Sequence, residues 1–187
     1  MKISLEGRVA IVTGAGGGLG RCHALALAAR GAKVVVNDLG DEAGNPSAAA
    51  LAVVEEIRAK GGEAIADGAS VTDFPAVERM VARAMDAWGR VDILINNAGV
   101  GLAGPVAEID PSDLERTLAV DLLGPLHLIQ AALPHMAGRG QIINVSSVLA
   151  AQPLPYLGGY AAAKAALERL GEALRMALRG SGVAGTT

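Results

Sequence analysis

The sequence is poor in aromatic residues, in cysteine and in net charge. Aromatic residues make up only 2% of its 187 residues against a hydrophobic share of 51%, so the core has to be aliphatic. The single cysteine, Cys22, excludes a disulfide within this chain and is typical of a reducing compartment, and we expect it to be packed rather than reactive. A net charge of −3 offers no basic face, so the sequence predicts no nucleic-acid partner.

Long hydrophobic runs are also missing. Lys2, Glu6 and Arg8 interrupt the first residues, so the sequence predicts no signal peptide. No run of about 18 apolar residues escapes a charge, a proline or a polar break, so it predicts no membrane partner either. These features predict a cytoplasmic protein, and the length predicts a single domain over residues 1–187.

Short β-branched runs alternate with helical segments along the chain. We expect strands at 9–12, 33–37, 63–66, 91–95, 141–145 and 183–187, and helices at 19–30, 48–60, 74–88, 111–136 and 160–179, the fourth of them interrupted at Gly124-Pro125. This alternation predicts an α/β fold, with a parallel sheet and helices on both faces.

A glycine-rich turn joins the first strand to the first helix. Glycines let the backbone approach a ligand closely, and the free N–H groups at the start of a helix attract anionic oxygen. Such a turn is also used as a simple tight connection, but its place between a strand and a helix favours a pyrophosphate site. The candidate residues are Gly14, Gly18, Leu19 and Gly20.

Asp38 ends the second strand, 18 residues after Gly20. In a dinucleotide-binding fold, a carboxylate there accepts hydrogen bonds from the adenine ribose hydroxyls. It would repel a 2′-phosphate, and no lysine or arginine lies between Gly14 and Gly20 to offset it. The sequence therefore predicts NAD rather than NADP as the cofactor.

Tyr160 and Lys164 are four residues apart on an expected helix, which places both side chains on one face. An ammonium group beside a phenol favours the phenolate, which can take a proton from an alcohol or return one to a carbonyl. Most tyrosine–lysine pairs at this spacing are merely neighbours on a helix, so only the other motifs indicate that this pair is catalytic.

Those motifs together are specific. T-G-x-x-x-G-x-G from Thr13, N-N-A-G from Asn96, a serine before the tyrosine and Y-x-x-x-K from Tyr160 occur in this order, and on them the chain resembles the short-chain dehydrogenase/reductase family. The resemblance implies a Rossmann-like doubly wound parallel sheet, a nicotinamide cofactor, and hydride transfer between an alcohol and a carbonyl.

The resemblance also implies residue roles. Ser147, 13 residues before Tyr160, would steady the substrate oxygen, whereas Ser146 would be a structural hydroxyl bonded to local backbone. Tyr160 and Lys164 would carry the proton chemistry, with Lys164 also holding the nicotinamide ribose. A further group would line the nicotinamide side of the site: Asn97, Ala98 and Gly99.

Two positions depart from the family pattern. Asp121 stands where the family has an asparagine as its fourth catalytic residue. The main-chain carbonyl of Asp121 is free in either case, because Pro125, four residues later, has no N–H to donate to it. The side chain, however, adds a negative charge near Lys164 that can shift the pH optimum. Alternatively, Asp121 faces solvent or pairs with a neighbour. Ser70-Val71 replaces an Asp-Val pair at the adenine, where Val71 would supply an apolar contact and Ser70 a weaker hydrogen bond.

The chain also lacks the family's usual C-terminal part. A Pro-Gly turn, a substrate-covering loop and a seventh strand normally follow the sixth strand, so we expect an exposed sheet edge. Three explanations stay open: the sequence is part of a longer enzyme, it is a natural short form that serves as a partner subunit, or a second chain completes the sheet.

We therefore expect an NAD-dependent oxidoreductase acting on a secondary alcohol or ketone. The stretch 34–40, V-V-V-N-D-L-G, is similar to the hydroxyacyl-CoA dehydrogenase branch and hints at a 3-hydroxyacyl substrate. The alternative is a truncated, non-catalytic NAD-binding subunit. Alanine-rich helix faces at 118–133 and 161–178 predict a homo-oligomer, a dimer or a tetramer.

Overall fold

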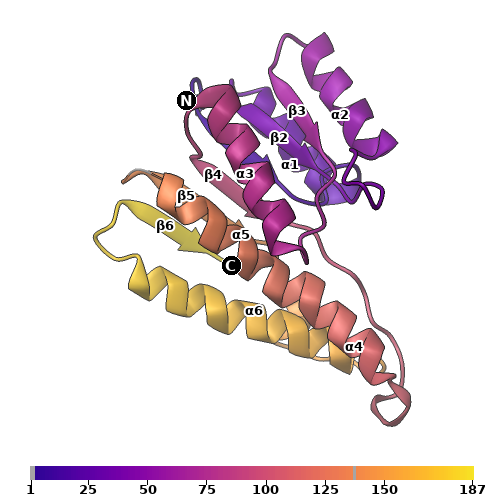
Figure 1. Ribbon diagram of the computed structural model, residues 1–187. Helices are drawn as coiled ribbons and strands as arrows, with labels where there is room; N and C mark the ends of the chain where they lie inside the picture. Colours follow the sequence, from indigo (N-terminus) through magenta and orange to yellow (C-terminus); the bar gives the residue numbers. More distant parts are fainter. Residues whose placement is uncertain (1–2, 137) are drawn as a thin grey trace.

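The computed structural model describes residues 3–136 and 138–187 and confirms the expected alternation of strands and helices (Figure 1). The strands are β1 (Val9–Val12), β2 (Lys33–Asn37), β3 (Ala64–Asp67), β4 (Ile93–Asn96), β5 (Gly140–Asn144) and β6 (Val183–Thr186). The α-helices are α1 (Gly18–Ala28), α2 (Ala48–Ala59), α3 (Phe74–Trp88), α4 (Pro111–Leu118), α5 (Gly124–Ala132) and α6 (Gly158–Ala177). Most boundaries lie within two residues of the predicted ones.

All strand pairs are parallel, in the order β3-β2-β1-β4-β5-β6. The carboxyl ends of the strands therefore meet at one edge, and the direction of winding reverses between β1 and β4. This is the Rossmann-like doubly wound sheet, whose ligands bind at that switch point. Among the described strands β6 pairs with β5 alone, so its outer edge is unpaired, as expected.

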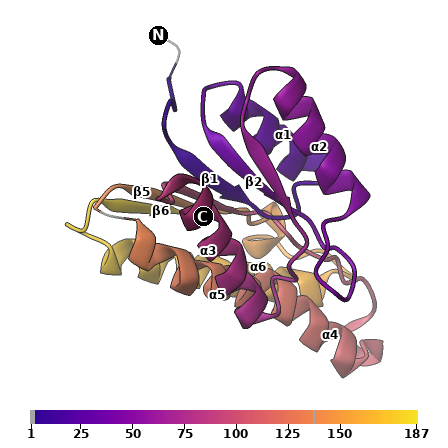
Figure 2. The same ribbon diagram turned by 45° about the horizontal axis from the view of Figure 1, so that its top comes forward.

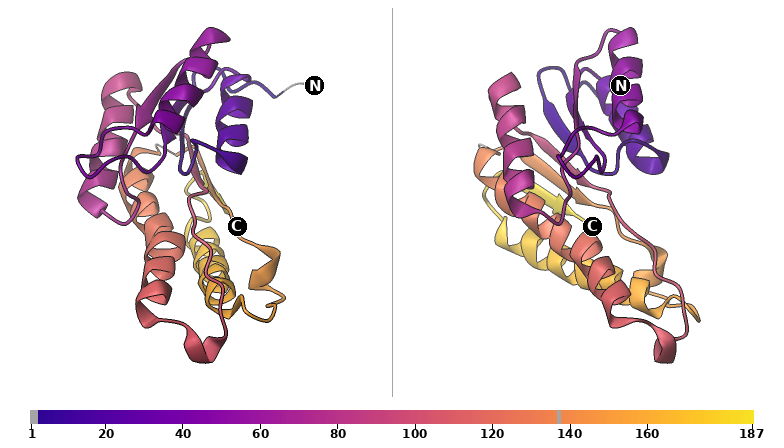
Figure 3. Two further views of the ribbon diagram at one scale, coloured as in Figure 1. Left: turned by 90° about the vertical axis from the view of Figure 1, so that its right-hand side faces the viewer. Right: turned by 45° about the vertical axis from the view of Figure 1, so that its right-hand side comes forward.

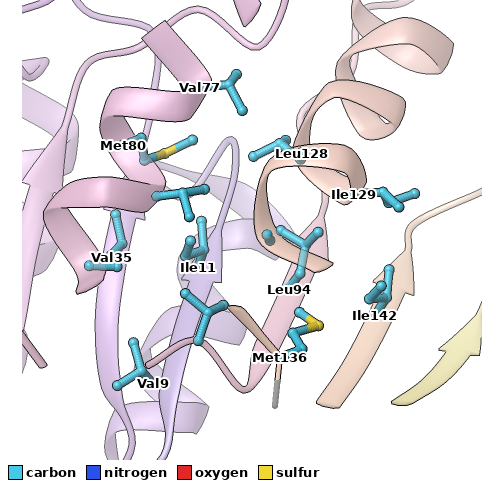
Figure 4. Close-up of a cluster of buried hydrophobic side chains, with 14 of the residues drawn as sticks. Val9, Ile11, Val35, Val77, Met80, Leu94, Leu128, Ile129, Met136 and Ile142 are labelled. Carbon is cyan, nitrogen blue, oxygen red and sulfur yellow. The ribbon is translucent and has the colours of Figure 1, made fainter. Parts of the chain in front are cut away.

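Helices cover both faces of the sheet (Figures 2 and 3). Because side chains alternate along a strand, Ile11 of β1 faces one layer and Val12 the other. On the first face α3 and α5 bury Val77, Met80, Leu128 and their neighbours (Figure 4). On the second face, α1 and α2 bury Ala24, Val53, Val54 and Ile57. Both layers are aliphatic, as the scarcity of aromatic residues predicts.

Cys22 lies on α1 but is exposed, so the expectation that it is packed is wrong. The helix meets the sheet through Gly20 and Ala24, which are four residues apart and buried. A residue midway between them points away from that face, because two residues turn an α-helix by about 200°.

The long helical stretch before β5 is interrupted as predicted. A π-helical turn, η2 (Ala119–Leu123), separates α4 from α5 and ends at Gly124. By length and composition, Pro111–His135 is long and apolar enough to cross a membrane, with a mean hydropathy of 1.2, although the sequence was expected to contain no such stretch. The core helix of a soluble protein passes the same test, and here Leu128, Ile129 and Ala132 are buried against the sheet.

Candidate active site

The turn between β1 and α1 depends on its glycines. Gly14 has a φ of +60°, and a Cβ on Gly20 would collide with the carbonyl oxygen of Gly14. In contrast, nothing lies within 4 Å of a Cβ built on Gly17 or Gly18. Leu19, in the first turn of α1, is 65% exposed. The first N–H groups of α1 therefore border open space, which is the arrangement that binds phosphate oxygens.

Thr13 joins this turn to the segment after β4. Its buried hydroxyl oxygen accepts hydrogen bonds from the N–H groups of Asn97 and Ala98, both at 3.0 Å. In return, the Asn97 amide donates to the carbonyl oxygens of Thr13 (2.9 Å) and Gly14 (3.2 Å). The Asn97 side chain thus supports the glycine turn. Sequence analysis missed the role of Thr13, although a hydroxyl ending an apolar strand signals a need for partners.

Asp38 directly follows β2 and lies beside the glycine turn. Its carboxylate oxygen Oδ2 accepts a hydrogen bond from the N–H of Gly16 at 2.7 Å. A Cβ on Gly16 would lie 2.7 Å from that same oxygen, so glycine is needed here. The first basic residue after the turn, Arg21, is paired with Glu56 of α2.

Ser70 and Val71 follow β3 and differ in exposure. The Ser70 hydroxyl lies 2.8 Å from that of Thr72 and accepts the Thr72 N–H at 3.3 Å, so it stabilises its own loop. Val71 is only 7% exposed, and a Cβ on Gly124 would lie 2.8 Å from its Cγ2. Its side chain therefore packs mainly against the start of α5, which leaves less of it for the expected contact with an adenine.

Lys164 is buried beside Tyr160. Its Nζ atom lies 5.7 Å from the centre of the Tyr160 ring, which is consistent with the predicted common helix face. The ammonium donates to the carbonyl oxygen of Val145 at 3.1 Å and lies 3.1 Å from Oδ2 of Asp121. Of the two readings that the sequence left open for the Asp121 side chain, exposure to solvent is wrong: Asp121 is 0% exposed and pairs with Lys164, itself 4% exposed.

The π-helical turn η2 brings Asp121 to this position. Its other carboxylate oxygen, Oδ1, accepts the N–H of Val100 at 2.8 Å. A Cβ on Gly99 would lie 3.1 Å from Oδ2 of Asp121 and 3.4 Å from Nζ of Lys164. The loop after β4, the turn η2 and helix α6 therefore converge on one buried ion pair.

Ser147 begins a 3-10 turn (Val148–Ala150) after β5, and its Oγ accepts the N–H of Leu149 at 3.2 Å. The preceding hydroxyl, that of Ser146, donates to Oε1 of Glu168 on α6 at 3.0 Å. The expectation that Ser146 bonds local backbone is therefore wrong. Successive side chains of an extended segment point in opposite directions, so the two serines have different surroundings.

The strand order, with a glycine turn at its switch point, defines a Rossmann-like α/β protein. A comparison with family models narrows this class: the model of the short chain dehydrogenase family matches residues 8–186. The chain therefore belongs to the short-chain dehydrogenase family.

Individual relatives agree with this assignment. A peroxisomal hydratase-dehydrogenase-epimerase of Saccharomyces cerevisiae is 42% identical over 183 residues, covering 92% of this chain and 20% of the yeast protein. An uncharacterized oxidoreductase of Methylorubrum extorquens is 42% identical over 166 residues, covering 89% of this chain and 65% of that protein. The crystal structure of a short chain dehydrogenase from Mycobacterium avium superimposes with a TM-score of 0.90 at 39% identity, covering 97% of this chain and 66% of that one.

Proposed function

We propose that this chain is an NAD-dependent oxidoreductase that transfers a hydride between NAD(H) and a secondary alcohol or its ketone. The observation that carries the proposal is the buried Lys164 ammonium 5.7 Å from the Tyr160 ring, in a member of the short-chain dehydrogenase family. An ammonium at this position favours the phenolate, which is the form that accepts a proton from an alcohol.

The glycine turn fits a dinucleotide. The open N-terminus of α1 would bind the pyrophosphate through its free N–H groups, with Gly14, Gly18, Leu19 and Gly20 lining the approach. Asp38, held by Gly16 at the same turn, would accept the ribose hydroxyls and repel a 2′-phosphate, which supports NAD over NADP. Ser70 would face the adenine and Ala98-Gly99 the nicotinamide, because they follow β3 and β4 at the same edge of the sheet.

The remaining chemistry belongs to side chains of the protein. A bound nicotinamide would supply the hydride acceptor or donor. Tyr160 would take the hydroxyl proton of the alcohol, or return it to the carbonyl oxygen in the reverse direction. Ser147 would donate a hydrogen bond to that oxygen, because its Oγ accepts the Leu149 N–H and leaves the hydroxyl hydrogen available.

We propose a 3-hydroxyacyl compound or a related alcohol as the substrate. The stretch 34–40 supports this choice, and so does the name of the yeast relative, which joins a hydratase to a dehydrogenase. Hydration of a double bond creates an alcohol that a dehydrogenase can oxidise. A cytoplasmic location and a homo-oligomer remain predictions of the sequence.

The test is a turnover assay on the purified chain. Short secondary alcohols and 3-hydroxyacyl thioesters are each offered with NAD or NADP, and the reduced cofactor is followed by its absorbance. We expect turnover with NAD, faster with hydroxyacyl thioesters than with short alcohols. NADP-preferring turnover would contradict the reading of Asp38. Calorimetric binding of NAD without turnover of any substrate would support the alternative, a non-catalytic NAD-binding subunit.

A further inference from the structure

His127 of α5 reaches the loop that follows β3. Its Nδ1 atom lies 3.0 Å from the carbonyl oxygen of Val71. A carbonyl oxygen only accepts hydrogen bonds, so Nδ1 carries the hydrogen and donates it, whatever the charge of the ring. The ring of Phe74, the first residue of α3, lies beside the imidazole, with the two ring centres 5.4 Å apart. The imidazole is therefore placed between α3 and this loop, with its donor aimed at one backbone atom.

The loop after β3 is fixed from outside at two backbone carbonyls. At its start, the Asn37 amide of β2 donates to the carbonyl oxygen of Ala69 at 2.9 Å. Two residues later, the bond from His127 fixes the carbonyl of Val71. The Val71 side chain also packs on α5, because a Cβ on Gly124 would lie 2.8 Å from its Cγ2. The position of Val71 is therefore set by α5.

Val71 keeps one free backbone group at the end of the sheet where Asp38 lies. The N–H of Asp38 donates to the carbonyl oxygen of Asp67, the last residue of β3, at 3.1 Å, so the segments after β2 and β3 are neighbours. The carbonyl of Val71 is taken by His127, and within residues 3–136 and 138–187 no group accepts a hydrogen bond from its N–H. Val71 is only 7% exposed, and a buried N–H needs an acceptor. A ring nitrogen of an adenine is such an acceptor.

We propose that His127 is a positioning residue for the adenine half of the cofactor. It fixes the backbone of Val71 through the carbonyl, and thereby the direction in which the adjoining N–H is offered to the adenine. The inference rests on the proposed function, because it takes a dinucleotide as the cofactor, but it does not involve the proton transfer at Tyr160. It predicts an effect on the affinity for the cofactor and none on the chemical step.

The test measures the affinity for NAD by calorimetry in variants of His127. His127→Phe keeps a planar ring beside Phe74 but has no donor, so we expect the Kd for NAD to rise by about 3–10-fold, the worth of one hydrogen bond. His127→Asn, whose amide nitrogen can take the place of Nδ1, should restore most of the affinity. The control, His135→Asn, removes an exposed imidazole beyond the end of α5 and should leave the Kd unchanged.

An unchanged Kd in a folded His127→Phe would overturn the proposal. If that variant does not fold, His127→Leu, smaller and also without a donor, takes its place. A purely structural role, in which His127 only joins α3 to α5, predicts a lower free energy of unfolding with an unchanged Kd for NAD.

Two further readouts locate the effect at the adenine. ADP-ribose contains the adenine but no nicotinamide, and its Kd should rise in His127→Phe by the same factor as that of NAD. In turnover, the KM for NAD should rise while kcat at saturating NAD stays at the wild-type value; a fall in kcat with an unchanged KM would contradict the proposal. A wild type that binds NAD without turnover, with the expected shift in Kd, would refute the proposed oxidoreductase and leave this inference standing. A wild type that binds no NAD would overturn both.

Discussion

Replacing Gly20 by alanine should disrupt the glycine turn far more than the same change at its neighbours. A Cβ at this position would collide with the carbonyl oxygen of Gly14 and lie 2.5 Å from Nδ2 of Asn97. The first of these atoms belongs to the backbone, so a change of rotamer cannot relieve the contact. The second is the amide that ties the turn to the segment after β4.

The cost has two parts. Overpacking against fixed atoms costs about 1–3 kcal/mol. Displacing the Asn97 amide also weakens its bonds to Thr13 and Gly14, each worth about 0.5–1.5 kcal/mol. We therefore expect Gly20→Ala to lower the free energy of unfolding by about 3 kcal/mol or more, a large share of the roughly 5–15 kcal/mol that holds a typical domain together.

Two neighbouring glycines serve as graded controls. Gly17 has an extended φ of −153° and open space around its Cβ position, so Gly17→Ala should cost less than about 1 kcal/mol. Gly18 has equal space but a φ of +51°, so Gly18→Ala should cost about 1–2 kcal/mol through backbone strain alone. Urea unfolding measures all three variants. An order other than Gly17 < Gly18 < Gly20 would refute this account of the turn.

Two further predictions concern stability away from the turn. Asp92 is 2% exposed; burial would raise the pKa of its carboxyl, but hydrogen bonds from Arg90, the Val9 N–H and Arg8 outweigh burial and hold that pKa below its usual value of 3.8. The stabilisation that the charged Asp92 carboxylate gives the fold is present above pH 3.8 and is lost as the pH falls through the lowered pKa. Asp92→Asn should therefore lower the free energy of unfolding by about 2–3 kcal/mol at neutral pH and by less in acid. An equal loss at neutral and at acid pH, measured by urea unfolding, would contradict this role of the carboxylate. Tyr156 has a φ of +67°, a backbone conformation that is strained for any residue with a Cβ. Tyr156→Gly should therefore raise the free energy of unfolding by up to about 1 kcal/mol, whereas Tyr156→Ala, which keeps the strain, should not. Equal effects of the two substitutions in thermal melts would argue against backbone strain at this position.

The fold and the outline of the site could be predicted because they rest on local patterns. An apolar run, a glycine turn and a helical period specify β1 and α1 through nearby residues alone, and the four-residue spacing of Tyr160 and Lys164 specifies a common helix face. Local residues also set the limits of α3, because the Asp73 side chain caps its first turn and the left-handed Gly89 ends it, in agreement with the expected range of 74–88.

The contacts that sequence analysis missed join residues far apart in the chain. For Asp121 the sequence placed the negative charge near Lys164 but left its partner open, and the ion pair that the structure shows joins the π-helical turn to α6. Ser146 bonds Glu168 for a similar reason, since α6 passes beside the end of β5. Val71 is covered by α5, whose Gly124 allows the close approach. Spacing along the chain carries no information on such partners.

The most direct test of the account is the turnover of Tyr160→Phe with NAD and an alcohol that the wild type oxidises. The variant loses one hydroxyl and keeps the ring beside Lys164, so NAD should bind as tightly as to the wild type. The account predicts a fall in kcat of about 10²–10⁴-fold, the usual contribution of a general base. Turnover at the wild-type rate would contradict the assignment of Tyr160 as the residue that transfers the proton.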